Sequence, residues 1–365
     1  MCVKPASVRL IVATPKWEQV PAPLVSPGYN QLMKILVFDA DETVRATFSA
    51  ALGGHDIVYV DGPVSPEALA AHSDSEVVSL FVPSSFQKEH FAALPHLKCI
   101  AARSTGVDNV DLVAAREHGV IVCNVPSYGA RTVAEFTFAL LLALSRRLPE
   151  AANQVRQEGN FETRALEGFD LFGKTIGVIG TGAIGKNVVK IAQGFGMHVL
   201  MFDKFPAAGL ESSDARYVAL DELLAQSDII TLHVPLVPEN MHLLGRDAFA
   251  KMKRGAYIIN TARGELIDTE ALLDALKSGA VQGAALDVLE GERALKDEIE
   301  LVKGTESIHV LKDIIRNHAL IDVPRVLVTP HIAFFSKEAY GEILSTSVNN
   351  IQHVAAGTPT NAVTP

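Results

Sequence analysis

Three glycines near the middle of the chain have the spacing of a dinucleotide-binding turn. Gly180, Gly182 and Gly185 follow an apolar, strand-like run and open a helix-like stretch. In such a turn the first glycine permits the tight bend, the second lets the backbone approach a pyrophosphate, and the third lets the helix pack on its strand. Ala183 and Ile184 would begin the helix, whose N-terminus offers N–H groups and a positive dipole end to phosphates. The motif therefore predicts a dinucleotide site.

An acidic residue at the end of the next strand indicates which dinucleotide is bound. Asp203 follows the apolar run 198–202, in the region where this motif places a ribose-binding acid. A carboxylate there accepts hydrogen bonds from ribose hydroxyls and repels a 2′-phosphate. We therefore expect NAD rather than NADP, although the adjacent Lys204 weakens this preference slightly. The alternative interpretation is a glycine-rich turn followed by a solvated aspartate.

A second acidic motif near the start of the chain suggests different chemistry. Asp39, Asp41 and Thr43 follow the strand-like run 35–38 and match the D-x-D-x-T pattern of haloacid dehalogenase-like phosphatases. In that chemistry the first aspartate is a nucleophile, the second is an acid or base, and Mg²⁺ lies between them. No paired-acid motif follows a later strand, so a phosphatase is the less favoured alternative and no metal is expected.

The elements that must position these residues alternate between strand and helix along the whole chain. Strand-like runs recur from 35–38 to 120–124 and again from 175–179 to 326–328. Such alternation predicts parallel sheets with helices on both faces. We expect an α/β fold of two Rossmann-like domains, a flavodoxin-like substrate domain and a dinucleotide-binding domain. The predicted limits are listed here: an N-terminal extension at 1–32, a discontinuous substrate domain at 33–128 and 331–365, and the NAD-binding domain at 129–330.

Composition restricts the partners that the protein can have. The chain has 365 residues, is 48% hydrophobic and 20% charged, and carries a net charge of −10. These values are typical of a folded protein with a large core, and the absence of a basic block argues against nucleic acid or anionic membrane as partners. Three cysteines without a C-x-x-C pair favour reduced thiols, so we expect a cytoplasmic location.

One stretch is apolar almost all round. The run Phe136–Leu144 lies in an expected helix that joins the two series of strands, and it is too short to span a membrane. A helix that is apolar on every side is buried between domains or subunits. Because this stretch is hard to bury within one domain, it predicts a homodimer.

Several longer motifs resemble those of the D-isomer-specific 2-hydroxyacid dehydrogenases, most closely the D-lactate dehydrogenases. The resemblance covers about residues 34–361, apart from a charged insertion at 293–325. It implies reversible hydride transfer between NAD and a small 2-keto or 2-hydroxy acid, with pyruvate and D-lactate favoured. The matching stretches are RSTGVDNVDL (103–112), NVPSYGARTVAEFTFALLLALSRR (124–147), LFGKTIGVIGTGAIGK (171–186), HVPLVPENMHLL (233–244), MKRGAYIINTARGELID (252–268), ALDVLEGE (285–292) and VLVTPHIAFFS (326–336).

The resemblance implies that Arg263, Glu292 and His331 are catalytic, and the chemistry of a 2-keto acid suits these residue types. Arg263 provides a planar, permanently charged fork for the substrate carboxylate and polarises the carbonyl. His331 is suited to protonate the oxyanion that hydride transfer leaves, and to act as the base in the reverse direction. Glu292 would bond to the other ring nitrogen, fix the tautomer and favour the protonated ring.

Further contacts follow from the same motifs. Asp287 is expected at the nicotinamide carboxamide, and Phe334 could form an apolar wall beside the substrate. The loop that contains Val82 and Pro83 resembles one whose backbone N–H groups hold the substrate carboxylate. The remaining expected cofactor contacts are Val234, Pro235, Asn240, Thr261, Ala262 and Arg263.

A binding protein of the same fold is the second alternative. Some NAD-sensing corepressors resemble this family and keep the three catalytic residues. Turnover of NADH with small 2-keto acids would separate an enzyme from such a protein.

Overall fold

The computed structural model describes residues 32–292 and 308–363. The expected extension at 1–32 and the first part of the expected insertion, 293–307, lie almost wholly outside the described residues. Two compact units are present. Unit 1 comprises Met1–Asn124 and Leu344–Pro365, and unit 2 comprises Val125–Ile343.

Unit 1 contains a six-stranded sheet in the order β13-β5-β4-β3-β1-β2, parallel except for β13. The series β2-β1-β3-β4-β5 is the flavodoxin-like order. Its central strands are buried on both faces, as expected where helices cover a parallel sheet. The strands are β1 (Lys34–Val37), β2 (Asp56–Tyr59), β3 (Val77–Leu80), β4 (Cys99–Ala102), β5 (Ile121–Cys123) and β13 (Ala362–Val363), and the helices are α1 (Glu42–Leu52), α2 (Pro66–Ala71), α3 (Lys88–Phe91) and α4 (Leu112–Glu117).

Unit 2 contains a seven-stranded parallel sheet in the order β12-β11-β10-β9-β6-β7-β8. Strand order reverses between β6 and β9, the position where open α/β sheets bind ligands beyond their carboxyl ends. The strands are β6 (Thr175–Ile179), β7 (His198–Phe202), β8 (Ala215–Tyr217), β9 (Ile229–Leu232), β10 (Ala256–Asn260), β11 (Val281–Leu286) and β12 (Val326–Val328).

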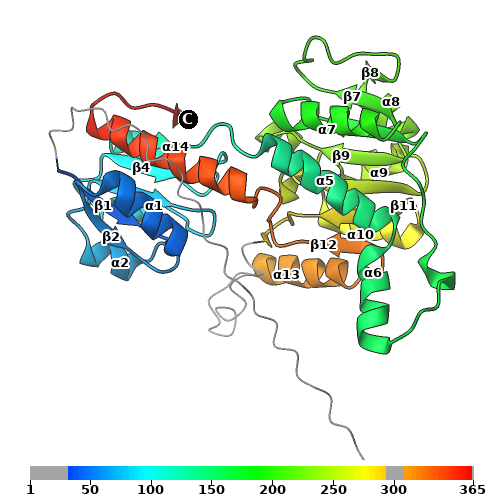
Figure 1. The fold of residues 1–365 in the computed structure, drawn as a ribbon, viewed down its shortest axis with the longest axis horizontal. Coiled ribbons are helices and arrows are strands. Elements are labelled where there is room, and N and C mark those ends of the chain that lie inside the picture. The colour runs from blue at the N-terminus through cyan, green and yellow to red at the C-terminus, as the bar shows by residue number, and fades with distance from the viewer. Residues whose placement is uncertain (1–31, 293–307, 364–365) are drawn as a thin grey trace, which may run out of the picture. The chain divides into compact units, whose positions relative to one another are not determined.

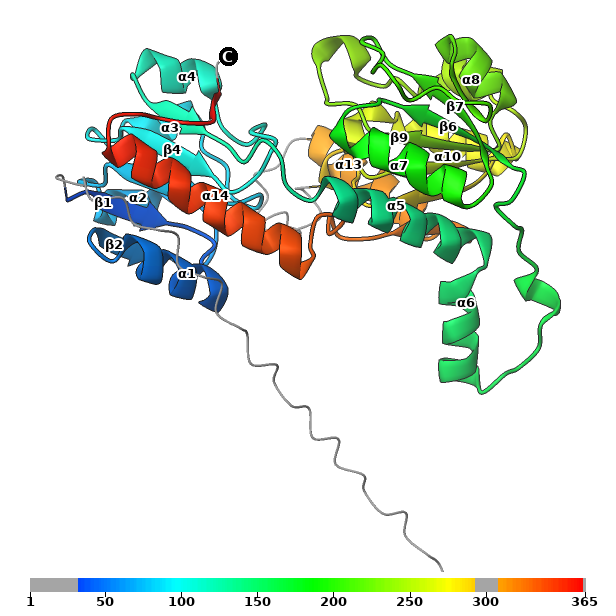
Figure 2. The same cartoon turned by 45° about the horizontal axis from the view of Figure 1, so that its top comes forward.

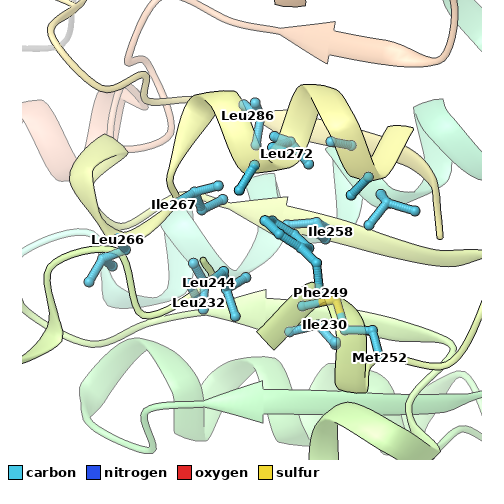
Figure 3. Packing of buried hydrophobic residues seen from close by; sticks show 14 of the residues in the cluster. Ile230, Leu232, Leu244, Phe249, Met252, Ile258, Leu266, Ile267, Leu272 and Leu286 are labelled. Carbon is cyan, nitrogen blue, oxygen red and sulfur yellow. The ribbon is translucent and has the colours of Figure 1, made fainter. Parts of the chain in front are cut away.

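Helices cover both faces of this second sheet. Helices α5 and α7 lie side by side on one face (Figures 1 and 2), and α8, α9 and α10 pack on the other around the core shown in Figure 3. The helices are α5 (Ala130–Ser145), α6 (Leu148–Asn153), α7 (Ala183–Gly194), α8 (Leu220–Gln226), α9 (Arg246–Lys251), α10 (Thr269–Ser278), α13 (Ile308–Ile321) and α14 (Lys337–Ala355), with short turns η1 (Gln154–Glu158), η2 (Arg164–Leu166), η3 (Pro238–Asn240) and η4 (Gly264–Leu266).

The unit boundaries differ from the predicted ones. The sequence placed them after residues 128 and 330, whereas the units divide after Asn124 and Ile343. The second boundary falls later because the segment after β12 is bonded to unit 2. The Asp287 carboxylate accepts the N–H groups of Ile332 and Ala333. The boundary therefore lies within α14.

The stretch Phe136–Leu144, expected to be hard to bury within one domain, packs largely against unit 2 itself. Phe138, Leu140, Leu141 and Leu144 are all buried in the core of unit 2 between α5, α7 and the sheet. Phe136 and Leu142 are partly buried against the same core, because α5 packs on α7 and on the sheet.

Candidate active site

The glycine turn between β6 and α7 has the geometry of a phosphate cradle. Gly180 has φ +98°, and a Cβ there would lie 2.5 Å from the carbonyl oxygen of His233. A Cβ on Gly185 would overlap the carbonyl of Gly180, so both positions require glycine. At Gly182 a Cβ would meet nothing within 4 Å, and this residue caps α7 without a side-chain hydrogen bond. The open N-terminus of α7 therefore fits the phosphates of a dinucleotide.

Asp203 at the end of β7 is held by the glycine turn. Its Oδ2 accepts Thr181 N–H at 2.6 Å and Thr181 Oγ1–H at 3.0 Å, and its Oδ1 accepts Phe205 N–H at 2.8 Å. Burial alone would raise the pKa of Asp203, but these hydrogen bonds outweigh it and lower the pKa, so the carboxylate is ionised at neutral pH. About one of its four acceptor positions remains for a ribose hydroxyl.

The residues after β9 form one wall beside this turn. The side chain of Val234 is the other group that a Cβ at Gly180 would meet. The loop beyond it is closed by Asn240, which donates to Pro235 O at 2.7 Å and accepts Val237 N–H at 2.8 Å. Asn240 thus shapes the loop, and its expected contact with the cofactor stays a prediction.

Sequence reasoning missed His233, the first residue of this wall. Its Nε2 lies 2.8 Å from Thr231 Oγ1, and its buried Nδ1 has no protein partner among the described residues. Burial lowers the pKa of His233 to about 3, so the ring is neutral. Its position directly after β9, at the reversal of strand order, was the available signal.

The turn that carries Arg263 follows β10. Arg263 is half-buried and precedes η4, with Nη1 donating to Ala262 O at 2.8 Å. Asn260 supports the turn by donating to Arg263 O and accepting the N–H of Ala262. The hydroxyl of Thr261 is buried against Thr137 at 3.1 Å. Ala262 and Thr261 therefore face protein in part, and their cofactor contacts remain predictions.

A close backbone approach joins the Arg263 turn to the turn that carries Glu292. A Cβ on Gly264 would overlap the peptide bond between Leu289 and Glu290. The two turns therefore pack backbone to backbone, and only glycine fits between them.

Glu292 and His331 are hydrogen-bonded, as the expected carboxylate–imidazole pair requires. The distance between Glu292 Oε1 and His331 Nδ1 is 2.6 Å, and the two side chains are 23% and 22% exposed. The other carboxylate oxygen of Glu292 accepts Leu289 N–H at 3.3 Å. Because Nδ1 is engaged, Nε2 is the ring nitrogen that can exchange a proton with a ligand.

The Asp287 carboxylate bonds to the Thr329 side chain before His331 and to the backbone after it. Its carboxylate accepts Thr329 Oγ1–H at 2.5 Å and the N–H groups of Ile332 and Ala333 at 2.9 and 2.8 Å. Within this clamp His331 has φ +57°, a left-handed conformation that is uncommon for a residue with a side chain. Burial raises the pKa of Asp287, although these hydrogen bonds oppose the shift. The expected carboxamide contact could use only the one acceptor position left on the carboxylate, and it stays a prediction.

The residues expected at the substrate lie in both units. In unit 2, the Phe334 ring packs edge-on against Tyr128, with 6.2 Å between centroids. In unit 1, Val82 and Pro83 follow β3. Proline has no N–H, so any backbone donor of this loop must come from its other residues, and the N–H of Val82 has no protein acceptor among the described residues.

The two aspartates of the D-x-D motif have structural partners. Asp39 accepts Phe81 N–H at 3.1 Å and Ser84 Oγ–H at 2.6 Å, while Asp41 caps α1 by accepting Val44 N–H at 2.7 Å. Within residues 32–292 and 308–363, no three His, Cys, Asp or Glu side chains gather as a metal site would require. The spacing of this motif is thus explained by a loop anchor and a helix cap.

The described helices also bear on membrane association. None of them combines the length and hydropathy needed to cross a membrane.

Comparisons with known proteins match the sequence of this chain to one family and its fold to solved structures of that family. A family model for the D-isomer specific 2-hydroxyacid dehydrogenase NAD binding domain matches residues 138–333. A 2-hydroxyacid dehydrogenase homolog of Haemophilus influenzae is 42% identical over 83% of this chain and 89% of its own length. The D-lactate dehydrogenase of Escherichia coli is 38% identical over 83% of this chain and 91% of its own. The structure of Aquifex aeolicus D-lactate dehydrogenase complexed with NAD and lactic acid has a TM-score of 0.80 and 31% identity, covering 89% of this chain and 96% of that one.

Proposed function

Because the chain belongs to the D-isomer-specific 2-hydroxyacid dehydrogenase family, we propose that it interconverts pyruvate and D-lactate. The chain is an NAD-dependent oxidoreductase of this family with an NAD-binding domain. Support for the smaller substrate comes from Phe334, an aromatic side chain three positions after His331 that suits a methyl group. The relative with bound lactic acid points to the same substrate.

The proposed mechanism uses three side chains of unit 2. Arg263 holds the substrate carboxylate and polarises the neighbouring carbonyl. Bound NADH supplies the hydride. His331 then donates the proton on Nε2 to the developing alkoxide, and takes it back in the oxidation of the hydroxy acid. Glu292 stabilises the positive charge of the imidazolium through Nδ1.

The 2.6 Å contact between Glu292 Oε1 and His331 Nδ1 carries this proposal. An ionised carboxylate on Nδ1 favours the protonated ring, so reduction should continue to higher pH than it would without that charge. Glu292→Gln keeps a hydrogen-bonding group and removes the charge. We expect its alkaline limit for reduction to move to lower pH, and an unchanged limit would contradict the role given to Glu292.

The substrate is tested by following NADH absorbance with a panel of 2-keto acids. Pyruvate should give the highest kcat/KM, ahead of branched, aromatic and phosphorylated 2-keto acids, and the product should be the D isomer. A higher kcat/KM for a larger acid would overturn the choice of pyruvate. Tight NADH binding without turnover of any acid would instead favour the NAD-sensing binding protein.

The proposal includes a cytoplasmic homodimer. Cys99 and Cys123 are buried free thiols, which suits a reducing compartment. Helix α6 and the segment after it project from unit 2 (Figures 1 and 2) and expose Leu148 and Phe161. Exposed apolar side chains of this kind suit a subunit interface. Light scattering should give a particle of about twice 39.1 kDa, and a monomer at micromolar concentration would contradict the dimer.

A further inference from the structure

An ion-pair contact outside the three catalytic side chains joins two distant parts of unit 2. His242 Nε2 lies 2.6 Å from Glu290 Oε1, although the residues are 48 positions apart. The second oxygen of Glu290 accepts Thr269 Oγ1–H at 3.0 Å and Thr269 N–H at 3.3 Å. The side chain of Glu290 is 22% exposed, and its carboxylate is held by His242 and Thr269.

Glu290 anchors the turn that carries Glu292. Its backbone carbonyl accepts the side-chain amide of Asn317 at 2.8 Å, so both its main chain and its side chain are tied down. Only one residue separates it from Glu292, whose carboxylate meets His331. Any movement of Glu290 would therefore move the carboxylate that holds the catalytic imidazole.

His242 is tied through its backbone to the residues that follow Arg263. Its N–H donates to Glu265 O at 2.8 Å, and Leu244 N–H donates to Leu266 O at 3.0 Å. Leu244 and Leu266 are both buried in the hydrophobic core of unit 2, where Figure 3 shows them. The main chain of His242 thus belongs to the Arg263 turn, while its side chain reaches the Glu292 turn.

The backbone of His242 is in an uncommon conformation. Its φ is +54°, in the left-handed region that asparagine and glycine adopt more readily. A histidine is not needed for such a bend. The side chain is explained by its contact with Glu290.

We propose that His242 and Glu290 form a positioning pair that sets the Arg263 turn against the Glu292 turn and so keeps Glu292 on His331. The inference rests on the proposed function only for the roles of Arg263, Glu292 and His331. We assign the pair a positioning role and no direct part in the chemistry.

The test compares two variants of His242 that differ in reach. His242→Asn suits the left-handed backbone but is too short to meet Glu290, whereas the amide of His242→Gln can reach the position of Nε2. We expect His242→Asn to lower kcat for pyruvate about tenfold through misplacement of Glu292, and to move the alkaline limit of reduction to lower pH. KM for NADH should stay within about twofold, and His242→Gln should recover most of the loss.

Glu290→Ala completes a double-mutant cycle. The double variant should be no slower than the slower single variant, because each change removes the same contact. His198→Asn is the matched control, since His198 forms an exposed pair with Asp214 at 3.7 Å in the same unit, at the amino end of β7. Additive losses, or equal losses for His242→Asn and His198→Asn, would overturn the proposal.

Hydrogen exchange measured by mass spectrometry provides a readout that needs no turnover. His242→Asn should speed exchange in peptides covering 287–292 and leave peptides of β1 and α1 in unit 1 unchanged. If the protein reduces no 2-keto acid, the proposed function fails while this experiment still decides whether the pair holds the turn. Unchanged exchange at 287–292 would overturn the pair in either case.

Discussion

An aspartate lies at the carboxyl edge of the sheet in each unit, half-buried at Asp39 and fully buried at Asp287, and each one holds a loop through its carboxylate. In unit 1, Asp39 holds the loop after β3 and itself has φ +49°. In unit 2, Asp287 holds the loop after β12, and the left-handed residue is its neighbour in the clamp, His331. The same device therefore constrains backbone in both units, and in unit 2 it presents an imidazole whose Nε2 can exchange a proton with a ligand.

The charged side chains near these two aspartates differ in exposure. In unit 1 the Arg103 side chain is 1% exposed and donates to Ser79 Oγ, Phe38 O and Asp39 O at 2.7–3.0 Å. In unit 2, Glu292 and His331 are each about one-fifth exposed. A guanidinium enclosed by carbonyl groups serves stability, whereas a partly open carboxylate–imidazole pair can meet a ligand. The two aspartates thus take different roles according to the charged side chains around them.

The largest expected effect is the loss of activity, without loss of stability, when His331 beside Asp287 is replaced. His331→Ala should lower kcat for pyruvate reduction by about 10²–10⁴-fold, because the proton donor is lost. Its urea midpoint should stay close to that of the native protein, since Asp287 bonds to the backbone beside His331 rather than to its ring. Steady-state kinetics and urea unfolding check both parts. Near-normal turnover in this variant would contradict the whole mechanism.

The matching change in unit 1 should reduce stability and leave NADH binding unchanged. Arg103→Met keeps the length of the side chain but leaves three buried acceptors without their donor, which should reduce the free energy of unfolding by about 3 kcal/mol. The dissociation constant for NADH should not change, because the glycine turn lies in unit 2. Urea unfolding and NADH fluorescence titration provide the two measurements. A stable variant with weakened NADH binding would reverse the roles given to the two clamps.

Asp203 provides a smaller, electrostatic effect within unit 2. Its lowered pKa keeps it ionised at neutral pH, where it should repel the 2′-phosphate of NADPH. Asp203→Asn removes the charge but keeps one side-chain oxygen that can accept the two hydrogen bonds from Thr181, so the preference for NADH should narrow by about tenfold. The ratio of kcat/KM for the two cofactors is the measurement. Equal use of both cofactors by the native protein would contradict the role of this carboxylate.

The smallest expected effect is the pH dependence of stability at Asp39. Burial raises the pKa of Asp39 above its ordinary value of 3.8, against the hydrogen bonds from Ser84 and Phe81 and the charge of Arg103. The folded state therefore binds the proton more tightly than the unfolded chain, and this contribution to stability is lost as pH rises above 3.8 through the folded pKa. Asp39→Asn cannot ionise, so its stability relative to the native protein should improve from pH 4 to pH 7. A constant difference in urea midpoints would show that this burial has no energetic consequence.

Local sequence patterns were enough to predict the glycine turn, Asp203 and the two series of strands. A tight turn before a helix depends on neighbouring residues, and the period of apolar residues follows from which faces of an element are covered. The pairing of Glu292 with His331 came from motifs rather than periodicity, since the residues are 39 positions apart.

Contacts between distant segments were decided only by the tertiary structure. Whether the apolar stretch in α5 would face a partner or its own domain depended on α7 and the sheet, which lie dozens of residues further along the chain. The roles of Asp287 and Asp39 depended on which loops ended beside them, and the pair of His242 and Glu290 depended on two turns that meet through Gly264. The sequence by itself determined what each residue can donate, accept or bury. Folding decided which partner it met, because desolvation and hydrogen bonding depend on neighbours that chain order does not specify.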